Sequence, residues 1–436
     1  MLHCSRDRPA AFLPALLAIL IAGCATPGPS PTPRPSPGPP SAAASAVPPS
    51  AEATTPGPTS VPGRSPAPAT MSIPAGALRS LPGLGPRAAQ GPLVYGELNR
   101  VAGESTGDAV ALGDLTSGLV RPLIRLAAGH ALADLAATDG RVVWVETWRD
   151  QPSPPGNAIP GCVDAGKPLR WRIRTLVPGA PAQDVASGTN VRTAIGGECA
   201  DVNPPVVAID GDRLAYALEA ATSASPVGNR IVVVSLASGS AIRTISTTGL
   251  VLDLRLSGTA IAYRECLPTF DDATVEPLDC RVMATASDDR LPAPVEAHAS
   301  ALALGGTRLA WVRSEAGDGS IFTSVLGSDE IVRVAVPLDA TLAVQGARLL
   351  AASDGVVAWS VDGTEIGGSE AGFWTSRLAV WLPGDPSARL LRGHGPPDFV
   401  AVGGGWLVWR DYVGKAGGAP EGLYGVPLEA LVDAAP

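Results

Sequence analysis

The larger part of the chain repeats one pattern of polar and apolar positions. In each repeat a glycine-containing turn precedes a short apolar run that ends in tryptophan or tyrosine. These terminal aromatic residues are Tyr95, Trp144, Tyr216, Tyr263, Trp311, Trp359 and Trp409. They are separated by 49, 72, 47, 48, 48 and 50 residues. A nearly constant period of this size indicates repeated supersecondary units, and six steps define seven units.

Each unit contains four short runs that are typical of β-strands. In the fifth unit, clusters of Gly, Ser and Asp separate the runs 301–304, 308–313, 321–325 and 331–336. The third unit has an almost uninterrupted apolar run from Ile231 to Val234, which is typical of a sheet covered on both faces. The pattern therefore predicts small sheets that stack against one another.

Four-stranded units that bury both faces against their neighbours are the blades of a β-propeller. We predict an all-β fold, a seven-bladed β-propeller of four-stranded antiparallel blades, over residues 71–436. The repeated aromatic residue is expected to fill the wedge between adjacent blades rather than to form a platform for sugars. The 72-residue step leaves open an eighth, shrunken blade, although its excess falls in two loops, 151–167 and 188–204.

The last unit lacks a fourth strand. Runs at 398–402, 406–409 and 422–426 account for three strands, and few residues follow them. The first unit has spare residues before Tyr95. We therefore expect the segment from Met71 to Leu81 to supply the missing outer strand and to join the two ends of the ring.

The N-terminus has the pattern of an export signal. Arg6 and Arg8 precede an apolar run over 12–22, which is short for a membrane-spanning helix. The run ends in Ile21-Ala22-Gly23-Cys24, which resembles the lipobox of bacterial lipoproteins. The resemblance implies a signal peptide over 1–23, lipidation of Cys24 and an extracytoplasmic protein anchored to a bacterial membrane. The alternatives are an ordinary secretory signal and an uncleaved N-terminal anchor.

Residues 24–70 form a linker rich in Pro, Ala and Ser. Its charged residues are Arg34, Glu52 and Arg64, and it contains almost no large apolar side chain. Such a segment cannot bury enough apolar surface to offset the conformational entropy of folding, so we expect it to be disordered. If it is extended as polyproline II, it reaches roughly 140 Å. The interpretation is a spacer between a lipid anchor and the propeller.

The repeat resembles that of the TolB-like (WD40-like) propellers. Three units keep the Asp-Gly turn of that family, in Ala137-Thr-Asp-Gly140, Ile209-Asp-Gly211 and Ala352-Ser-Asp-Gly355, without the proline that precedes it there. The run from Asn229 to Gly239 is similar to the third strand and turn glycine of the same repeat. The resemblance implies the architecture. It does not imply an activity, because such propellers serve as scaffolds, binding modules and enzymes.

The net charge and the motifs of the sequence argue against several classes of function. The formal net charge of −9 argues against a nucleic-acid partner. The sequence contains no Gly-x-Ser-x-Gly elbow, no His-Glu-x-x-His helix and no phosphate-binding glycine loop. The histidines beyond the signal are His130, His298 and His394, in different units. We therefore expect no cofactor and no metal.

Four cysteines remain once Cys4 leaves with the signal and Cys24 carries lipid. Cys162, Cys199, Cys266 and Cys280 allow three disulfide connectivities, and disulfides are expected in an exported chain. In a propeller, all four fall in loops on one face. Cys266 and Cys280 bracket a single loop between two strands. This placement favours the pairs Cys266–Cys280 and Cys162–Cys199.

The same face gathers four acids. Glu97, Glu146, Glu265 and Asp411 each stand two residues after a repeat aromatic. If this equal phase is also equal geometry, they form a loose ring that binds a cation, a basic peptide or a sugar hydroxyl. The alternative interpretation is a set of solvated strand ends.

These features together suggest a lipid-anchored binding or scaffold protein of the cell envelope. It would display loops on one propeller face to a protein, peptide or glycan. The alternative is an envelope hydrolase or lyase that acts on a polysaccharide or peptide with carboxylates of that face.

Overall fold

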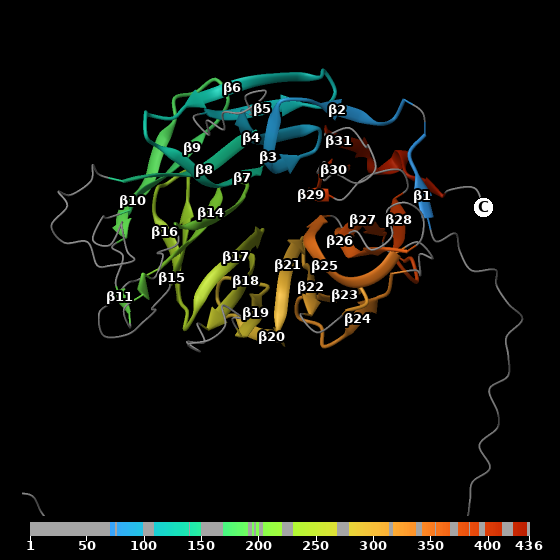
Figure 1. Cartoon of the computed structure of the whole chain (residues 1–436). Helices are drawn as coiled ribbons and strands as arrows, with labels where there is room; N and C mark the ends of the chain where they lie inside the picture. The colour runs from blue at the N-terminus through green and yellow to red at the C-terminus, as the bar shows by residue number, and fades with distance from the viewer. Residues whose placement is uncertain are drawn as a thin grey trace, which may run out of the picture. The chain divides into compact units, whose positions relative to one another are not determined.

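The protein folds into seven β-sheets that stand around a common centre (Figure 1). The structure is a computed structural model. It describes residues 70–98 except 75, 109–138, 140–149, 169–190, 194–195, 198–199, 204–219, 230–267, 279–313, 317–336, 342–353, 355–366, 374–382, 384–391, 397–411 and 422–433. The predicted signal, Cys24 and almost all of the predicted linker therefore lie outside the described residues.

The first four blades each contain four antiparallel strands, numbered from the innermost strand outward. Blade 1 consists of β3 (Leu84–Gln90), β4 (Leu93–Leu98), β5 (Ala109–Asp114) and β6 (Leu119–Arg125). Blade 2 consists of β7 (Ala131–Thr138), β8 (Arg141–Arg149), β9 (Leu169–Leu176) and β10 (Gln183–Asn190). Blade 3 consists of β13 (Val206–Asp210), β14 (Arg213–Leu218), β15 (Arg230–Ser235) and β16 (Ala241–Ser246). Blade 4 consists of β17 (Leu250–Ser257), β18 (Ala260–Leu267), β19 (Asp279–Thr285) and β20 (Ala293–Ala297).

The remaining blades include the two ends of the described chain. Blade 5 consists of β21 (Ala299–Gly305), β22 (Arg308–Arg313), β23 (Ile321–Val325) and β24 (Ile331–Val334). Blade 6 consists of β25 (Leu342–Ser353), β26 (Val356–Glu365), β27 (Trp374–Trp381) and β28 (Arg389–Leu391), extended at its outer edge by β1 (Thr70–Ser72) and β32 (Val432–Asp433). Blade 7 consists of β29 (Pro397–Gly403), β30 (Trp406–Asp411), β31 (Gly422–Pro427) and β2 (Arg79–Leu81). A 3-10 turn, η1 (Leu428–Ala430), follows β31.

The predicted seven blades are confirmed, and the described residues of the long step form no further blade. Part of its excess forms a separate two-stranded hairpin, β11 (Ala194–Ile195) and β12 (Glu198–Cys199). The second predicted loop begins later than expected, because Gly188 belongs to β10. Within the described residues the structure has no helix that is long and apolar enough to cross a bilayer.

The recurring turn glycine has a conformational cause. Gly140 and Gly211 lie in the tight turns between the first two strands of their blades, with φ of 70° and 56°. A residue with a Cβ atom adopts this left-handed region at a steric cost, and glycine does not. This explains why the Asp-Gly pattern marks the hairpins.

Apolar packing between neighbouring blades forms the core. The described residues form seven clusters of buried hydrophobic side chains, and each joins one adjacent pair of blades. Trp144, Trp311, Trp359 and Trp409 are fully buried in these clusters. The prediction that the repeat aromatics act as wedges between blades is confirmed for these four residues.

The first blade departs from the common register. Tyr95 is the third residue of β4, whereas Trp144 and the other repeat aromatics are the fourth residues of their strands. Tyr95 therefore faces blade 2 and shares a cluster with Trp144. Gly96 occupies the position of the wedge in blade 1, where a Cβ atom would lie 2.0 Å from the carbonyl oxygen of Gly85.

The ring closes through strands from the two ends of the described chain. Arg79 to Leu81 pair antiparallel with Leu423 to Gly425 and complete blade 7, as expected. Thr70 and Met71 pair parallel with the outer strand of blade 6, and β32 pairs antiparallel with β1. The segment predicted to supply one outer strand therefore contributes to two blades.

The closure predicts a large effect of one leucine. Leu81 is 1% exposed and packs between blades 7 and 1. We expect Leu81→Ala to lower the free energy of unfolding by about 2–5 kcal/mol, because it leaves a cavity in the interface that closes the ring. Denaturant unfolding would measure this. Leu291, which is 80% exposed, is the matched control. Equal effects of Leu81→Ala and Leu291→Ala would contradict the role of β2.

Candidate functional site

Three of the four predicted acids occupy equivalent positions, and the fourth does not. Glu146, Glu265 and Asp411 are the sixth residues of β8, β18 and β30, whereas Glu97 is the fifth residue of β4. The three equivalent acids are 1%, 2% and 2% exposed. Because side chains alternate along a strand, these three face the preceding blade and Glu97 faces the following one.

Glu265 binds the connection that enters its own blade. Its Oε1 accepts hydrogen bonds from the backbone N–H groups of Thr248 and Gly249, the latter at 2.7 Å, and from Thr248 Oγ1 at 2.9 Å. Its Oε2 accepts two bonds from Arg281, at 2.9 and 3.0 Å. Thr248 and Gly249 lie between β16 and β17, so this carboxylate fixes the chain between blades 3 and 4.

The surroundings of Glu265 stabilise its charged form. Burial raises the pKa of Glu265, but the hydrogen bonds from Gly249, Thr248 and Arg281 together bring it below its ordinary value. Since the folded pKa is lowered, the contribution of Glu265 to stability is present above its unfolded pKa and is lost as the pH falls through the lowered value.

Glu146 makes the equivalent contact in blade 2. Its Oε1 lies 2.6 Å from His130 Nδ1, and its Oε2 accepts a hydrogen bond from Arg172 at 2.9 Å. His130 belongs to the connection between β6 and β7, and its ring stacks on Trp148 with centroids 4.5 Å apart. Glu97, by contrast, accepts two hydrogen bonds from Arg87 within blade 1, at 3.0 and 2.7 Å.

The structure therefore does not bring the four acids together as one site. Among the described residues, no three His, Cys, Asp or Glu side chains converge in a way that could hold a metal ion. Glu146 and Glu265 are not solvated strand ends, because both are buried and hold connections between blades. The sequence pattern identified the position that Glu146, Glu265 and Asp411 share in their strands, but it did not predict that this position is buried.

One of the two predicted disulfides is present. Cys266 and Cys280 are bonded, with their Cα atoms 4.0 Å apart, and directly oppose each other in β18 and β19. Cys162 and the side chain of Cys199 lie outside the described residues. We call the face that carries the loops between second and third strands, together with the connections between blades, the connector face. The disulfide lies at this face.

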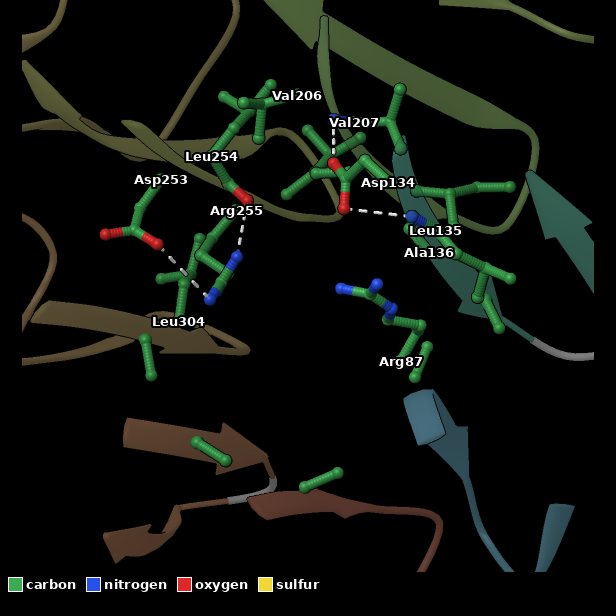
Figure 2. Close-up of a pocket in the computed structure, with 18 of the residues that line it drawn as sticks. Arg87, Asp134, Leu135, Ala136, Val206, Val207, Asp253, Leu254, Arg255 and Leu304 are labelled. Carbon is green, nitrogen blue, oxygen red and sulfur yellow. Dashed lines mark hydrogen bonds and ion pairs between the residues drawn. The ribbon is translucent and has the colours of Figure 1, made fainter. Parts of the chain in front are cut away.

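A cavity of about 590 Å³ runs along the propeller centre, and all seven innermost strands contribute to its wall. We call this cavity the channel. Much of its wall is alanine, for example Ala88, Ala136 and Ala352. The described residues that line it include four charged ones, Arg87, Asp134, Asp253 and Arg255 (Figure 2). The small side chains leave the channel open, and the four charged residues make one part of its wall polar.

Asp134 links blades 2 and 3 from within the channel wall. Its Oδ1 accepts a hydrogen bond from the backbone N–H of Leu135 at 2.9 Å, and its Oδ2 accepts one from that of Val207 at 2.8 Å. Burial raises the pKa of Asp134 to about 6, although these two N–H groups and the charges on Arg255 and Arg87 lower it.

The sequence contained a signal for these residues that the predictions missed. Each interrupts an otherwise apolar first strand: LGPRAAQ in β3, ALADLAAT in β7 and LVLDLRLS in β17. A charged residue in a largely apolar innermost strand is therefore a candidate for the channel wall.

Solved structures with the same architecture identify the fold but not the site. The β-propeller domain of the Trilobed protease from Pyrococcus furiosus has a TM-score of 0.50 at 10% identity, covering 80% of this chain and 95% of that one. Pyrococcus horikoshii acylaminoacyl peptidase has a TM-score of 0.50 at 10% identity, covering 81% of this chain and 52% of that one. No family model and no curated protein sequence matches the chain. The chain is thus a seven-bladed propeller that resembles the propellers of these peptidases.

Glu265 acts as a clamp, because it binds both the connection that enters blade 4 and Arg281. Neutralising its carboxylate is therefore predicted to lower the stability of the fold. We expect Glu265→Gln to lower the free energy of unfolding at neutral pH by about 1–3 kcal/mol, because the amide NH₂ would face N–H donors in either orientation. Glu330→Gln is the matched control, since Glu330 is exposed. Thermal and denaturant melts would compare the two variants. A Glu265→Gln melt identical to that of the wild type would contradict the clamp.

Proposed function

We propose that this protein is exported, is held at a bacterial membrane by lipid on Cys24, and presents the connector face of its propeller to a protein, peptide or glycan of the cell envelope. The signal-like N-terminus and the lipobox-like quartet support the anchor. The Asp-Gly repeat supports an assignment to the TolB-like propellers. The proline-rich segment 24–70 supports a spacer between lipid and propeller.

The observation that carries the proposal is the Cys266–Cys280 disulfide at the connector face. Disulfides persist in oxidising compartments and are rare in the reducing cytosol, so this bond supports export. It also cross-links β18 to β19 at the connector face, which lowers the entropy of the unfolded chain. Loops that a rigid scaffold positions are suited to recognition.

The alternative of an envelope hydrolase gains no support from the predicted acids. Glu146 and Glu265 are each held by an arginine and by a connection between blades. A general acid or base needs an accessible proton and a pKa suited to transfer. These two carboxylates are buried and serve the fold instead.

The anchor predicts lipid labelling that depends on one cysteine. We expect the full chain, expressed in a bacterium and fed an alkyne-bearing fatty acid, to incorporate the label and to sediment with membranes. Cys24→Ala should abolish the labelling, because it removes the thiol that carries the lipid, whereas Cys4→Ala should retain it. Equal labelling of the Cys24→Ala variant would refute the anchor.

The displayed face predicts where partners cross-link. Ala128 lies exposed in the connection between β6 and β7 at the connector face. Leu291 lies exposed between β19 and β20, on the opposite face. We expect a photo-reactive residue at position 128 of the full chain to give discrete adducts in intact cells, and one at position 291 to give none. Adducts from position 291 alone would overturn the choice of face.

A further inference from the structure

The channel contains arginines whose hydrogen-bonding capacity the fold uses only in part. Arg255 donates to the carbonyl oxygen of Leu254 at 3.0 Å and lies 3.8 Å from Asp253 Oδ1. Its side chain is 40% exposed. Arg87 donates from Nε and one terminal nitrogen to Glu97, and its side chain is 49% exposed. Figure 2 shows the Arg87 guanidinium extending from the wall and the Arg255 guanidinium beside Leu254 and Asp253.

The acids of the channel, by contrast, are engaged. Asp253 accepts a hydrogen bond from Arg264 Nε at 2.7 Å. Both oxygens of Asp134 accept backbone N–H groups. The donors that remain available in the channel therefore belong to arginine.

We propose that the channel is a binding site for a ligand that carries a single carboxylate, held by Arg255 with the help of Arg87. The planar guanidinium fork matches a carboxylate with two parallel hydrogen bonds. A volume of about 590 Å³ lies within the range of small-molecule sites. The alanine-lined wall accommodates the uncharged remainder of the ligand without a specific polar contact.

A monoanion suits this site better than a phosphate or another dianion. Asp134 and Asp253 lie in the same wall as the two arginines, so a second negative charge would be repelled at short range. Two sources offer the required group: the C-terminal carboxylate of a peptide, and the carboxylate of an acidic sugar. This inference concerns the channel and does not depend on the anchor, on export or on the connector face.

Calorimetric titration of the purified full chain with matched probes tests the proposal. One pair is N-acetyl-alanyl-alanine and its C-terminal amide, and the other is galacturonate and galactose. We expect at least one carboxylate probe to bind and its neutral counterpart not to bind. Binding of the peptide acid alone identifies the peptide source, and binding of galacturonate alone identifies the sugar.

Two arginine variants separate the site from general charge effects. Arg255→Gln should weaken binding by about tenfold or more, since it removes a charged, bidentate donor. Arg333→Gln is the matched control, because Arg333 lies exposed at the outer edge of blade 5 and pairs with Asp318. Should Arg255→Gln unfold, Arg255→Lys keeps the charge without the fork and should still weaken binding. Absence of carboxylate binding, equal binding of neutral probes, or unchanged affinity in a folded Arg255 variant would overturn the proposal.

Discussion

Every blade of this protein has two apolar faces, and the need to cover both governs the structure. A single four-stranded sheet would leave buried residues such as Trp311 and Leu309 in water, at a cost proportional to the apolar area exposed. The ring satisfies all blades at once, with one hydrophobic cluster at each junction. Closure by β2 and β31 is therefore as important as any blade. It also creates the channel, whose wall includes Arg87 near one end of the described chain and Phe399 near the other.

The architecture was readable from the sequence because its signals are local. A turn glycine at positive φ and a short apolar run recur at each hairpin, so blade number and strand order follow from counting. The same counting failed in blade 1, because Tyr95 follows Gly91, the first residue of its turn, by about one residue fewer than Tyr216 follows the equivalent Gly211. This shift of one residue turns Tyr95 and Glu97 toward the opposite neighbour. A pattern aligned on the turn glycine cannot detect such a shift, since glycine can occupy either position of the two-residue turn.

The burial of the acids and their partners could not be predicted from the sequence, for a different reason. Glu146, Glu265 and Asp411 share a position that the spacing identified, but their burial depends on the segments that cover them. Those segments, such as Thr248 and Gly249, precede the acid by 17 and 16 residues and carry no motif that indicates a carboxylate partner. The backbone N–H groups of Thr248 and Gly249 at the entrance of blade 4 need an acceptor, and the buried Glu265 at the end of the second strand provides it. Local sequence specifies the acid, whereas the ring specifies its role.

The charged residues on the blade faces contribute to stability, whereas the arginines of the channel keep the capacity to bind a ligand. On the blade faces, carboxylates such as Glu265 are buried and surrounded by donors, so their hydrogen-bonding capacity is spent within the fold. Along the channel, donors rather than acceptors keep unused hydrogen-bonding capacity. Asp253 accepts a hydrogen bond from Arg264, whereas Arg255 has no carboxylate within hydrogen-bonding distance among the described residues. Packing between blades does not require a half-exposed guanidinium in an alanine-lined bore. Its placement is more economically explained by a ligand that enters the channel than by the stability of the ring.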